Sequence, residues 1–463
     1  MTPPALPLDV FDALPPAVRA YIRYLEARLA DLEARLNQNS SNSSQPPSSD
    51  GPHVKPAPAK APTGKARGGQ PGHPKRSRPE LPPDTVVELR PDACDRCAHP
   101  LTGTDPEPLR HQVLELPSVR PQVTEYRRHR LTGPNCGRVL CPALPPEVRG
   151  GYGPRAQAAC AVPTGAYRIG KRGVARVMGD LFGLPISPAA VCDLQHRTAT
   201  ALEPVAAEVQ AHVVGKPANV DETGWREGRK RAWLWAAVTA GVTAFVIRRS
   251  RARTVLGELI PGTLGVRTTD RYPVYSHLKA DRRQVCGAHL RRDFQAMSDR
   301  GNDGTPIGQG LLALADELLG QWKRVRDATR TRRRFGSHHL QGIRAGVHVL
   351  LRRGRECRCA KTAGVCRGLL AVSGALYTFA AVAGVEPTNN AAERALRHAV
   401  CWRKTSYGTD SPGGSRFVER VLTVVASCRQ QGRDLLAFLT HAIQAARNGT
   451  PAPSLIPTPL ATP

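Results

Sequence analysis

Apolar residues near the start of the chain repeat at a helical spacing. Six of them follow one another at intervals of four, three, four, three and four residues: Val18, Ile22, Leu25, Leu29, Leu32 and Leu36. Glu, Arg and Asp occupy many of the positions between them. This a/d pattern predicts a helix of about three heptads that pairs with a second copy in a coiled coil. Because three heptads are marginal, a helix packed on its own domain is the alternative.

The middle of the chain alternates between strand-like and helix-like patterns. Four stretches read as strands: Pro217–Val220, Arg231–Thr239, Thr243–Arg248 and Leu264–Thr269. Turn signals at Arg226-Glu227-Gly228 and Gly241 separate the first three. The chain from Phe294 to Val385 is mostly helical and basic, and a further helix starts after Pro387. A three-strand meander followed by alternating elements predicts an α/β fold.

Two helices with a short break between them precede these strands. Lys171–Phe182 carries an apolar face, and Gly183-Leu-Pro-Ile186 interrupts the pattern. Ser187 is then a natural N-cap with Pro188 at the first helical position, and the second helix follows over Ala189–Leu202. This order is typical of a helix-turn-helix, although any pair of antiparallel helices can resemble one.

A polar segment separates the N-terminal helix from the rest of the chain. Residues 37–80 contain no aromatic residue, and Lys55–Arg78 holds seven basic side chains and no acidic one. We expect a disordered, positively charged linker there. Folded sequence resumes near Leu81 with two strand-like stretches, Thr85–Arg90 and His111–Leu116.

Four cysteines surround these stretches. Cys94 and Cys97 form a Cys-x-x-Cys pair, and Cys136 and Cys141 follow about 40 residues later. In a reduced compartment this spacing predicts a tetrahedral Zn²⁺ ribbon, with His99 or His129 as substitute ligands. Because four residues rather than two separate the second pair, ordinary buried thiols are the alternative.

The charge of the chain indicates a polyanionic partner. Lys and Arg outnumber Asp and Glu by 66 to 38, a net charge of +28, and nucleic acid is the commonest partner for such a surface. Residues 1–16 contain no basic n-region and no apolar h-region, so no secretory signal is expected. Two uncharged runs, Ala232–Ile247 and Gly368–Val385, read better as buried core than as membrane spans. We therefore expect a soluble intracellular protein with reduced cysteines.

Three carboxylates are placed for metal chemistry. Asp221 is expected just past the first strand and Asp270 just past the fourth, while Glu393 falls in the helix that begins near Asn389. Such acids can hold two Mg²⁺ ions about 3.5–4 Å apart for phosphoryl transfer. Glu393 has an alternative role, because Asn390-Ala391-Ala392-Glu393 also fits a capping box.

Motifs along nearly the whole chain closely resemble the IS66 family of bacterial insertion-sequence transposases. The resemblance runs from the leucine repeat to about Arg447 and is most specific around Glu393. It is carried by Asn39–Asp50, Gly68–His73, Val220–Trp225, Arg231–Trp235, Thr269–Tyr272, Val285–Phe294, Val385–Gly408 and Gly414–Arg420.

The resemblance implies an order of domains. A leucine-zipper-like N-terminus, a zinc-binding segment and a helix-turn-helix would precede an RNase H-like DDE core that a helical insertion interrupts. On this chain the resemblance assigns a coiled-coil helix to 1–36, the linker to 37–80, a zinc-ribbon-like segment to 81–149 and the DNA-binding helix-turn-helix to 150–213. The first part of the core is 214–293, the helical insertion 294–385, the core helix with the catalytic Glu 386–410 and the C-terminal helical segment and tail 411–463.

The resemblance also implies an activity. Asp221, Asp270 and Glu393 match the three catalytic acids of the family. With two Mg²⁺ ions they would cut DNA at the ends of the element and join those ends to target DNA. Expected partners are DNA, a second copy of the chain and accessory proteins of the same element, in the bacterial cytoplasm on the nucleoid. Four basic residues of the same helix would meet phosphates, with a solvated surface as the alternative: Arg394, Arg397, Arg403 and Lys404.

Two departures from the family pattern leave other functions open. Gly133 stands where the family has the first Cys of a Cys-Pro-x-Cys-Gly knuckle, and Gly287 stands where it has a Trp. Cys286 and His289 resemble the Cys/Asp-x-x-His motif of several DDE transposases, although one helix face also explains that pair. The alternatives are a catalytically inactive DNA-binding protein on the same scaffold and an RNase H-like nuclease without strand transfer.

Overall fold

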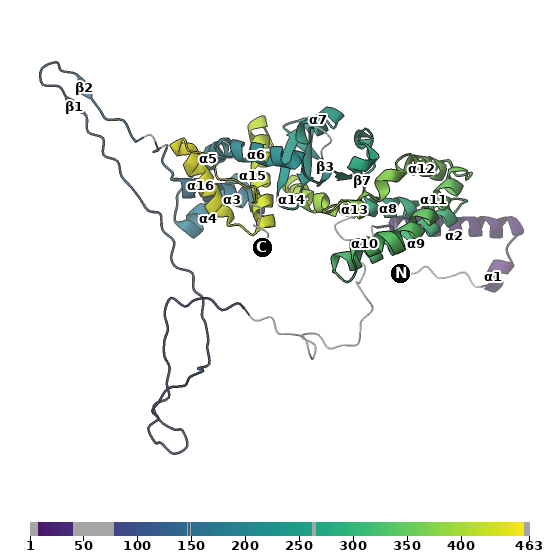
Figure 1. Cartoon of the computed structure of the whole chain (residues 1–463), viewed down its shortest axis with the longest axis horizontal. Helices are drawn as coiled ribbons and strands as arrows, with labels where there is room; N and C mark the ends of the chain where they lie inside the picture. Colours follow the sequence, from purple (N-terminus) through teal and green to yellow (C-terminus); the bar gives the residue numbers. More distant parts are fainter. Residues whose placement is uncertain (1–7, 40–77, 146, 149, 262–264, 458–463) are drawn as a thin grey trace. The chain divides into compact units, whose positions relative to one another are not determined.

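A computed structural model describes residues 8–39, 78–145, 147–148, 150–261 and 265–457 (Figure 1). Residues 55–121 form one unit by their contacts, and the rest of the chain forms the other. Every helix and strand among the described residues belongs to this larger unit. We refer to its residues 150–457 as the body.

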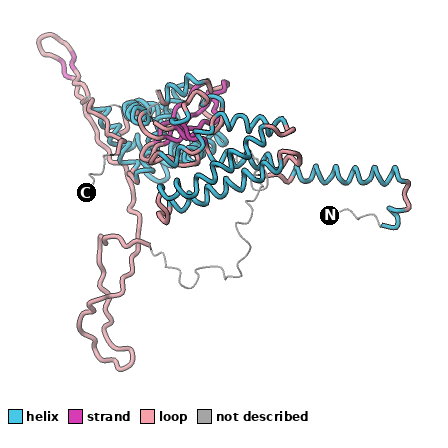
Figure 2. Tube along the Cα trace, turned by 45° about the vertical axis from the view of Figure 1, so that its right-hand side comes forward, coloured by secondary structure: helices cyan, strands magenta, loops and turns pink. Residues whose placement is uncertain are grey.

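The centre of the body is a five-stranded sheet with the strand order β5-β4-β3-β6-β7. Its strands are β3 (Ala218–Glu227), β4 (Lys230–Val238), β5 (Thr243–Arg248), β6 (Arg267–Thr269) and β7 (Arg283–Val285). β3, β4 and β5 pair antiparallel, whereas β6 and β7 continue from β3 in parallel. The predicted α/β class is therefore present as one mixed sheet among helices (Figure 2).

Helices cover both faces of the sheet because β4 is apolar on both. Trp235 and Ala237 point into one buried cluster with α6, α7 and α16, while Leu234 and Ala236 point into another with α14 and α15. These helices are α6 (Glu203–Val214), α7 (Arg253–Leu259), α14 (Asn390–Ser406), α15 (Pro412–Gln431) and α16 (Leu435–Asn448). The α14 helix therefore lies against the sheet beside β3 (Figure 1).

The predicted pair of helices before the sheet is present. α4 (Lys171–Phe182) has the expected bounds, and α5 (Pro188–Ala201) begins after Ser187, whose hydroxyl accepts the Ala190 N–H at 3.1 Å. Gly183 ends α4 in the left-handed conformation, φ +58°. Both helices share an apolar cluster with α3 (Pro154–Tyr167).

The chain between β7 and α14 is helical, as predicted. Its elements are α8 (Gly287–Ser298), α9 (Thr305–Arg326), α10 (Arg332–Arg334), the π-helical turn η4 (Phe335–Leu340), α11 (Gln341–Arg355), α12 (Ala360–Ala371), η5 (Ser373–Leu376) and α13 (Thr378–Ala381). Two short 3₁₀ turns, η2 (Pro273–Tyr275) and η3 (Ala280–Arg282), connect β6 to β7. α8, α9, α11 and α12 build a core of their own.

The segments that precede the body bury little. α1 (Leu8–Asp12) is followed by α2 (Pro16–Leu36), which contains the predicted leucine repeat, and its leucines are exposed. The predicted linker lies mostly at 40–77, outside the described residues. The strands predicted at 85–90 and 111–116 are wrong, because the described residues of that unit form no strand there. Their apolar side chains find no sheet to cover, and Leu89 and Leu116 are 88% and 87% exposed.

Neither uncharged run is a membrane helix. Residues 232–247 form most of β4 and β5, and residues 368–385 fall in short helices and turns. No helix among the described residues is both long and apolar enough to cross a bilayer. A two-stranded hairpin, β1 (Leu131–Thr132) with β2 (Val139–Leu140), completes the elements.

Candidate active site

Asp221 lies within a strand rather than past its end, which corrects the sequence prediction. β3 continues to Glu227, and Asp221 pairs with Ala236 of β4. The turn predicted at 226–228 is one residue later and tighter, with Gly228 at φ +59° directly before Arg229. The second half of β3 is mostly polar, so the apolar pattern did not predict it as a strand.

Asp270 comes directly after β6, as predicted. β6 runs parallel to β3, with Asn219 opposite Thr268. Asp221 comes two residues after Asn219, and Asp270 comes two residues after Thr268. The Oδ1 atom of Asp270 accepts the Tyr272 N–H at 2.9 Å, which fixes that carboxylate at the sheet edge. The two aspartates therefore lie side by side.

Two asparagines fasten the start of α14 to β3. The side-chain amide of Asn389 donates to the Val220 carbonyl at 2.9 Å, and that of Asn219 donates to the Thr388 carbonyl at 3.0 Å. Asn389 is fully buried. Glu393, in the first turn of α14, is thereby directed toward the two aspartates. Sequence reasoning missed these amides, although their position next to Asp221 and Glu393 was a usable signal.

The capping box proposed for Glu393 is not formed. The N-cap position of α14 is Asn389 instead of Asn390, and it makes no capping bond with its side chain. The Glu393 Oε1 atom is buried without a hydrogen-bond partner among the described residues. The carboxylate therefore does not cap α14 and instead lies near two basic side chains, His289 and Arg292.

The three acids form one electrostatic group. Burial raises the pKa of Asp221 well above its usual range, and the charges of Glu222, Asp270 and Glu393 raise it further. Carboxylates brought together in this way repel one another unless a cation joins them. Carboxylate oxygens are also the ligands that Mg²⁺ prefers. Carboxylate donors of this kind fit a divalent metal; the Glu393 Oε1 atom makes no hydrogen bond within the described residues and has His289 at 3.5 Å and Arg292 at 3.8 Å as charged neighbours.

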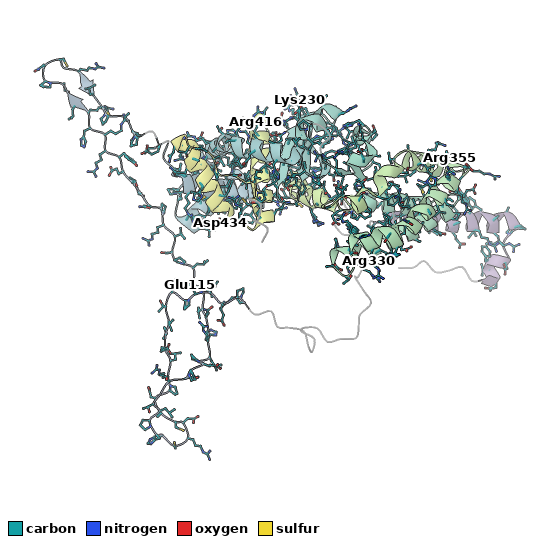
Figure 3. The ribbon with its side chains drawn as sticks, in the orientation of Figure 1. Glu115, Lys230, Arg330, Arg355, Arg416 and Asp434 are labelled. Atoms are coloured by element: carbon teal, nitrogen blue, oxygen red, sulfur yellow. The ribbon has the colours of Figure 1, made fainter. Side chains whose placement is uncertain are left out.

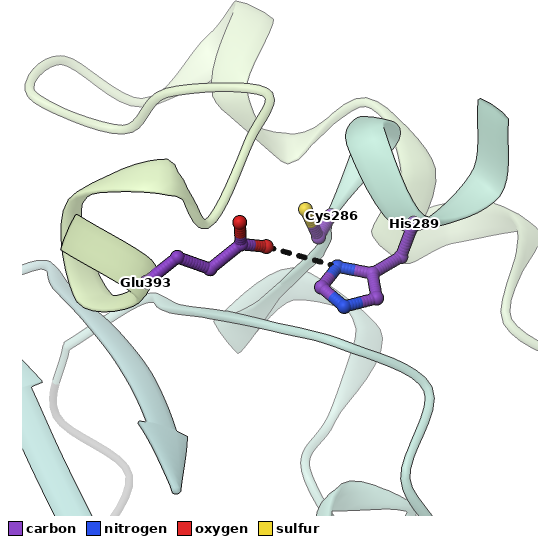
Figure 4. Close-up of side chains that lie close together, drawn as sticks. All are labelled: Cys286, His289 and Glu393. Carbon is purple, nitrogen blue, oxygen red and sulfur yellow. Dashed lines mark ion pairs between the residues drawn. The ribbon is translucent and has the colours of Figure 1, made fainter. Parts of the chain in front are cut away.

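Cys286 and His289 approach the same acid (Figure 4). The His289 Nδ1 atom lies 3.5 Å from Glu393 Oε1, and the Cys286 sulfur belongs to the same group of ligand atoms within 4.8 Å of one another. Burial and the charge of Arg292 lower the pKa of His289, while burial raises the pKa of Cys286 to about 11. The Cys286 sulfur also accepts the Asn389 N–H at 3.1 Å. This bond holds the start of α14, the helix that carries Glu393.

Glu222, next to Asp221, belongs to a second network. Its side chain is 1% exposed and pairs with Arg251 at 2.5 Å, and it accepts the Tyr275 hydroxyl at 2.5 Å. Burial raises the pKa of Glu222, and its bonds to Tyr275 and Arg251 oppose that shift. The Arg251 guanidinium lies over the Tyr272 ring at 3.6 Å. This network joins β3 to the loop after Asp270.

Two other acids near the site have structural partners. Asp293 pairs with Arg271 at 2.9 Å. Glu386 accepts the indole N–H of Trp322 at 2.8 Å. Both are therefore suited as controls for the three central carboxylates.

The predicted phosphate-binding residues divide into two groups. Arg394, Arg397 and Lys404 are exposed on α14. Arg403 is partly buried and donates to the Gly224 carbonyl of β3. Gly287 begins α8 and donates to the Pro387 carbonyl at 2.7 Å; a Cβ atom there would meet that oxygen at 3.2 Å, so a side chain would need the neighbouring backbone to give way.

Two backbone hydrogen bonds close the turn that contains Cys94 and Cys97. The Cys94 N–H bonds the His99 carbonyl at 3.0 Å, and the Ala98 N–H bonds the Cys94 carbonyl at 2.9 Å, with Ala98 at φ +56°. Backbone N–H groups of Arg96 and Cys97 lower the pKa of Cys94, which favours the thiolate that binds metal.

The turn at Gly133 repeats this geometry in the other unit. The Gly133 N–H bonds the Arg138 carbonyl at 2.9 Å, and the Gly137 N–H bonds the Gly133 carbonyl at 2.9 Å, with Gly137 at φ +67°. Gly133 therefore occupies the position that Cys94 holds in its own turn, and Cys136 corresponds to Cys97. Cys141 lies beyond this turn, one residue after β2. The Zn²⁺ ribbon stays a prediction, since its two pairs belong to separate units.

Comparison with known proteins gives three matches. Residues 149–416, more than half of the chain, match the family described as "Transposase IS66 family". Residues 10–79 match a family of unknown function, DUF6444. Over 248 residues the chain is 27% identical to "Uncharacterized protein y4qI" of Sinorhizobium fredii, a stretch that is 48% of this chain and 45% of that protein. The chain thus spans about half the length of the curated relative that it matches.

Proposed function

This chain belongs to the IS66 transposase family, and on that premise we propose that it is a DDE transposase. It cuts DNA at the ends of an insertion sequence and joins those ends to target DNA. The observation that carries the proposal is that Asp221 and Asp270 lie side by side at neighbouring strands and that burial and the charges of Asp270 and Glu393 raise the pKa of Asp221.

The order of strands supports an RNase H-like core. Three antiparallel strands followed by two parallel ones, with acids on β3, after β6 and on the helix beside β3, form the arrangement that such a core uses. The helical segment between Phe294 and Val385 is then an insertion between the second and third acids. The helices α4 and α5 would form the DNA-reading helix-turn-helix.

The acids would hold Mg²⁺ through their carboxylate oxygens. With two Mg²⁺ ions bound, the site gains the means to activate the attacking oxygen and to stabilise the leaving oxygen of a phosphodiester. Asn219 and Asn389 keep Glu393 directed at the aspartates, and the Tyr272 N–H keeps Asp270 in place. Arg394, Arg397 and Lys404 are exposed on α14, where they would contact DNA phosphates.

The segments before the body would assemble the complex. Pairing of the leucine repeat on α2 would bring two DNA ends into one complex. Zn²⁺ at Cys94, Cys97, Cys136 and Cys141 would order the segment between α2 and the body. DNA ends, target DNA and a second copy of the chain are the proposed partners, with accessory proteins of the same element.

Joining of pre-cleaved ends tests the proposal. The full chain is incubated in Mg²⁺ with duplexes that already carry the exposed 3′-hydroxyl of an element end, together with a plasmid target. Strand transfer into the plasmid is the expected result. Cutting of DNA without joining would favour an RNase H-like nuclease, and binding without either reaction would favour an inactive DNA-binding protein. Either result would overturn the proposal.

A further inference from the structure

A basic groove lies along the outer half of β3. It has a volume of about 830 Å³ and is lined by residues of β3, of β4 and of the end of α14. Six lining residues are basic: Arg226, Arg229, Arg231, Arg251, Arg403 and Lys404. No lining residue is acidic. Lys230, labelled in Figure 3, marks the β3–β4 turn at the outer end of these strands.

The groove lies on the same strand and the same helix as two of the three acids, although no acid lines it. Gly224, in its lining, lies three residues after Asp221 on the same strand, and Arg251 reaches from the groove to the Glu222 carboxylate. Along α14, Arg403 is ten residues, or about 15 Å, from Glu393. The groove is therefore within about 15 Å of the acids along α14, a span of a few nucleotides.

Several of the groove's cations have no acidic partner. Arg226, Arg229 and Lys404 are exposed and form no ion pair with any residue that the structure describes. Arg403, in contrast, is fixed by the Gly224 carbonyl. A concave surface with unpaired cations of one sign suits a phosphate backbone.

An exposed aromatic ring stands at the end of the groove. Tyr407 is 75% exposed and has φ +58°, a conformation that Gly or Asn adopts more easily than Tyr. The backbone after it is fixed against β3: the Thr409 N–H bonds the Arg226 carbonyl at 3.0 Å, and the Gly228 N–H bonds the Thr409 carbonyl at 2.7 Å. The fold thus presents a large apolar ring to solvent from a rigid and unfavourable position. Tyr407 ends α14, where its N–H bonds the Arg403 carbonyl at 2.8 Å, but that role needs no aromatic ring.

We propose that this groove binds a short single-stranded segment of DNA, with one unpaired base stacked on Tyr407. Phosphates would meet Arg226, Arg229 and Lys404. Unpaired bases stack on exposed aromatic rings within basic grooves, whereas bases of a duplex are already stacked on their neighbours. The inference rests on the proposed function, because it takes DNA as the ligand. It adds that unpaired nucleotides of that DNA bind in this groove.

Binding of single-stranded DNA by the full chain is the test. The Asp221→Asn variant serves as parent, which removes turnover, and the probes are fluorescein-labelled dT12 and the dT12·dA12 duplex at 0.2 M salt. Tyr407→Ala is expected to weaken dT12 binding by about tenfold and duplex binding by less than about twofold, because loss of stacking affects unpaired bases. Tyr407→Phe keeps the ring and is expected to bind as the parent does.

Three controls separate stacking from folding and from general charge. Tyr407→Asn suits the left-handed backbone but lacks the ring, so it should keep or raise the melting temperature and still lose dT12 affinity. Tyr167→Ala removes another exposed tyrosine, 62% exposed on α3, and should change nothing. Arg229→Ala should reduce the slope of log affinity against log salt for dT12 by about 0.7.

Two results would overturn the inference. Unchanged dT12 binding by Tyr407→Ala would remove the stacking role, and equal losses for dT12 and duplex would make the groove a duplex site. These outcomes leave the acids untouched. A parent that still joined DNA ends would instead contradict the proposed function while the binding result stood.

Discussion

Apolar side chains are buried in the body but mostly exposed in the segments that precede it. In the body, both faces of the sheet are covered, and Leu234 and Trp235 of β4 are fully buried. Before it, Leu29 of α2 is 54% exposed and Leu109 is 102% exposed. A chain that exposes so many apolar side chains lacks the burial that stabilises a fold. The body therefore buries its apolar side chains within one chain, whereas the described residues before it leave many of theirs exposed.

The largest expected effect falls on chemistry in the body. Asp221→Asn, Asp270→Asn and Glu393→Gln keep side-chain volume but remove charge, so each should lower cleavage and strand transfer by a factor on the order of 10³ or more. DNA binding and oligomeric mass should not change. Single-turnover assays on element ends measure the loss.

Glu386→Gln and Asp293→Asn are the matched controls for these substitutions. Each removes one charge near the site from a residue with a structural partner, and each should keep most of the activity. Equal losses in the controls would mean that any charge near the site matters, and the assignment of the three acids would be wrong.

The second-largest expected effect is on self-association, with no change in the fold of the body. Leu25→Glu combined with Leu32→Glu places two charges on the a/d repeat, where a paired helix would have to bury them. The mass in light scattering should fall to that of a monomer, with dimer affinity lowered by about a hundredfold or more, while circular dichroism of the body is unchanged. An unchanged mass would show that the repeat does not pair.

The sequence predicts elements with local signals well and elements that depend on long-range pairing poorly. The α4–α5 pair was predicted almost to the residue because its signals are local: Gly183 ends one helix, and Ser187 with Pro188 starts the next. β7 was missed because its three residues become a strand only by pairing with β6. The two strands expected at 85–90 and 111–116 did not form. Alternating apolar and polar residues form a sheet only where partner strands and a covering layer are present.

The candidate site shows the same limit. Its three acids could be chosen from motifs, but the first strand was expected to end at Val220, whereas β3 continues through mostly polar residues to Glu227. The side-chain hydrogen bonds of Asn219 and Asn389 each join positions 169 residues apart, so no local sequence pattern predicts them. The partner of Glu222 was equally hidden, because Arg251 and Tyr275 come from separate loops.

A smaller effect is expected at the turn where a metal ligand is missing. Gly133→Cys places a thiol where Cys94 stands in the equivalent turn, so Zn²⁺ affinity should rise by about tenfold or more. A Cβ at Gly133 would lie 3.0 Å from the Cys136 sulfur, which can rotate away. Competition with a chromophoric chelator measures the affinity. Gly133→Ser adds similar bulk without a thiol and should not bind more Zn²⁺; equal affinities for all three proteins would argue against a ribbon.

The smallest effect expected is on the stability of the body. A raised pKa means that folded Asp221 holds its proton more tightly than the unfolded chain does, so stability falls as pH rises above the usual carboxyl range. Without divalent metal at pH 7.5, Asp221→Asn should therefore melt a few degrees higher than the natural protein. Added Mg²⁺ should raise the melting temperature of the natural protein but not that of Asp221→Asn. Asp281→Asn, at an exposed acid, is the control and should respond to Mg²⁺ as the natural protein does.

Iron-directed cleavage of the polypeptide tests the central claim most directly. Fe²⁺ bound in place of Mg²⁺ generates hydroxyl radicals in the presence of ascorbate and peroxide, and these cut the backbone beside the metal. If Asp221, Asp270 and Glu393 share one metal site, the cuts should fall near residues 221, 270 and 393, should disappear with excess Mg²⁺ and should be lost together in Asp221→Asn. Cuts confined to one of the three positions, or a pattern that Asp221→Asn leaves unchanged, would contradict the account.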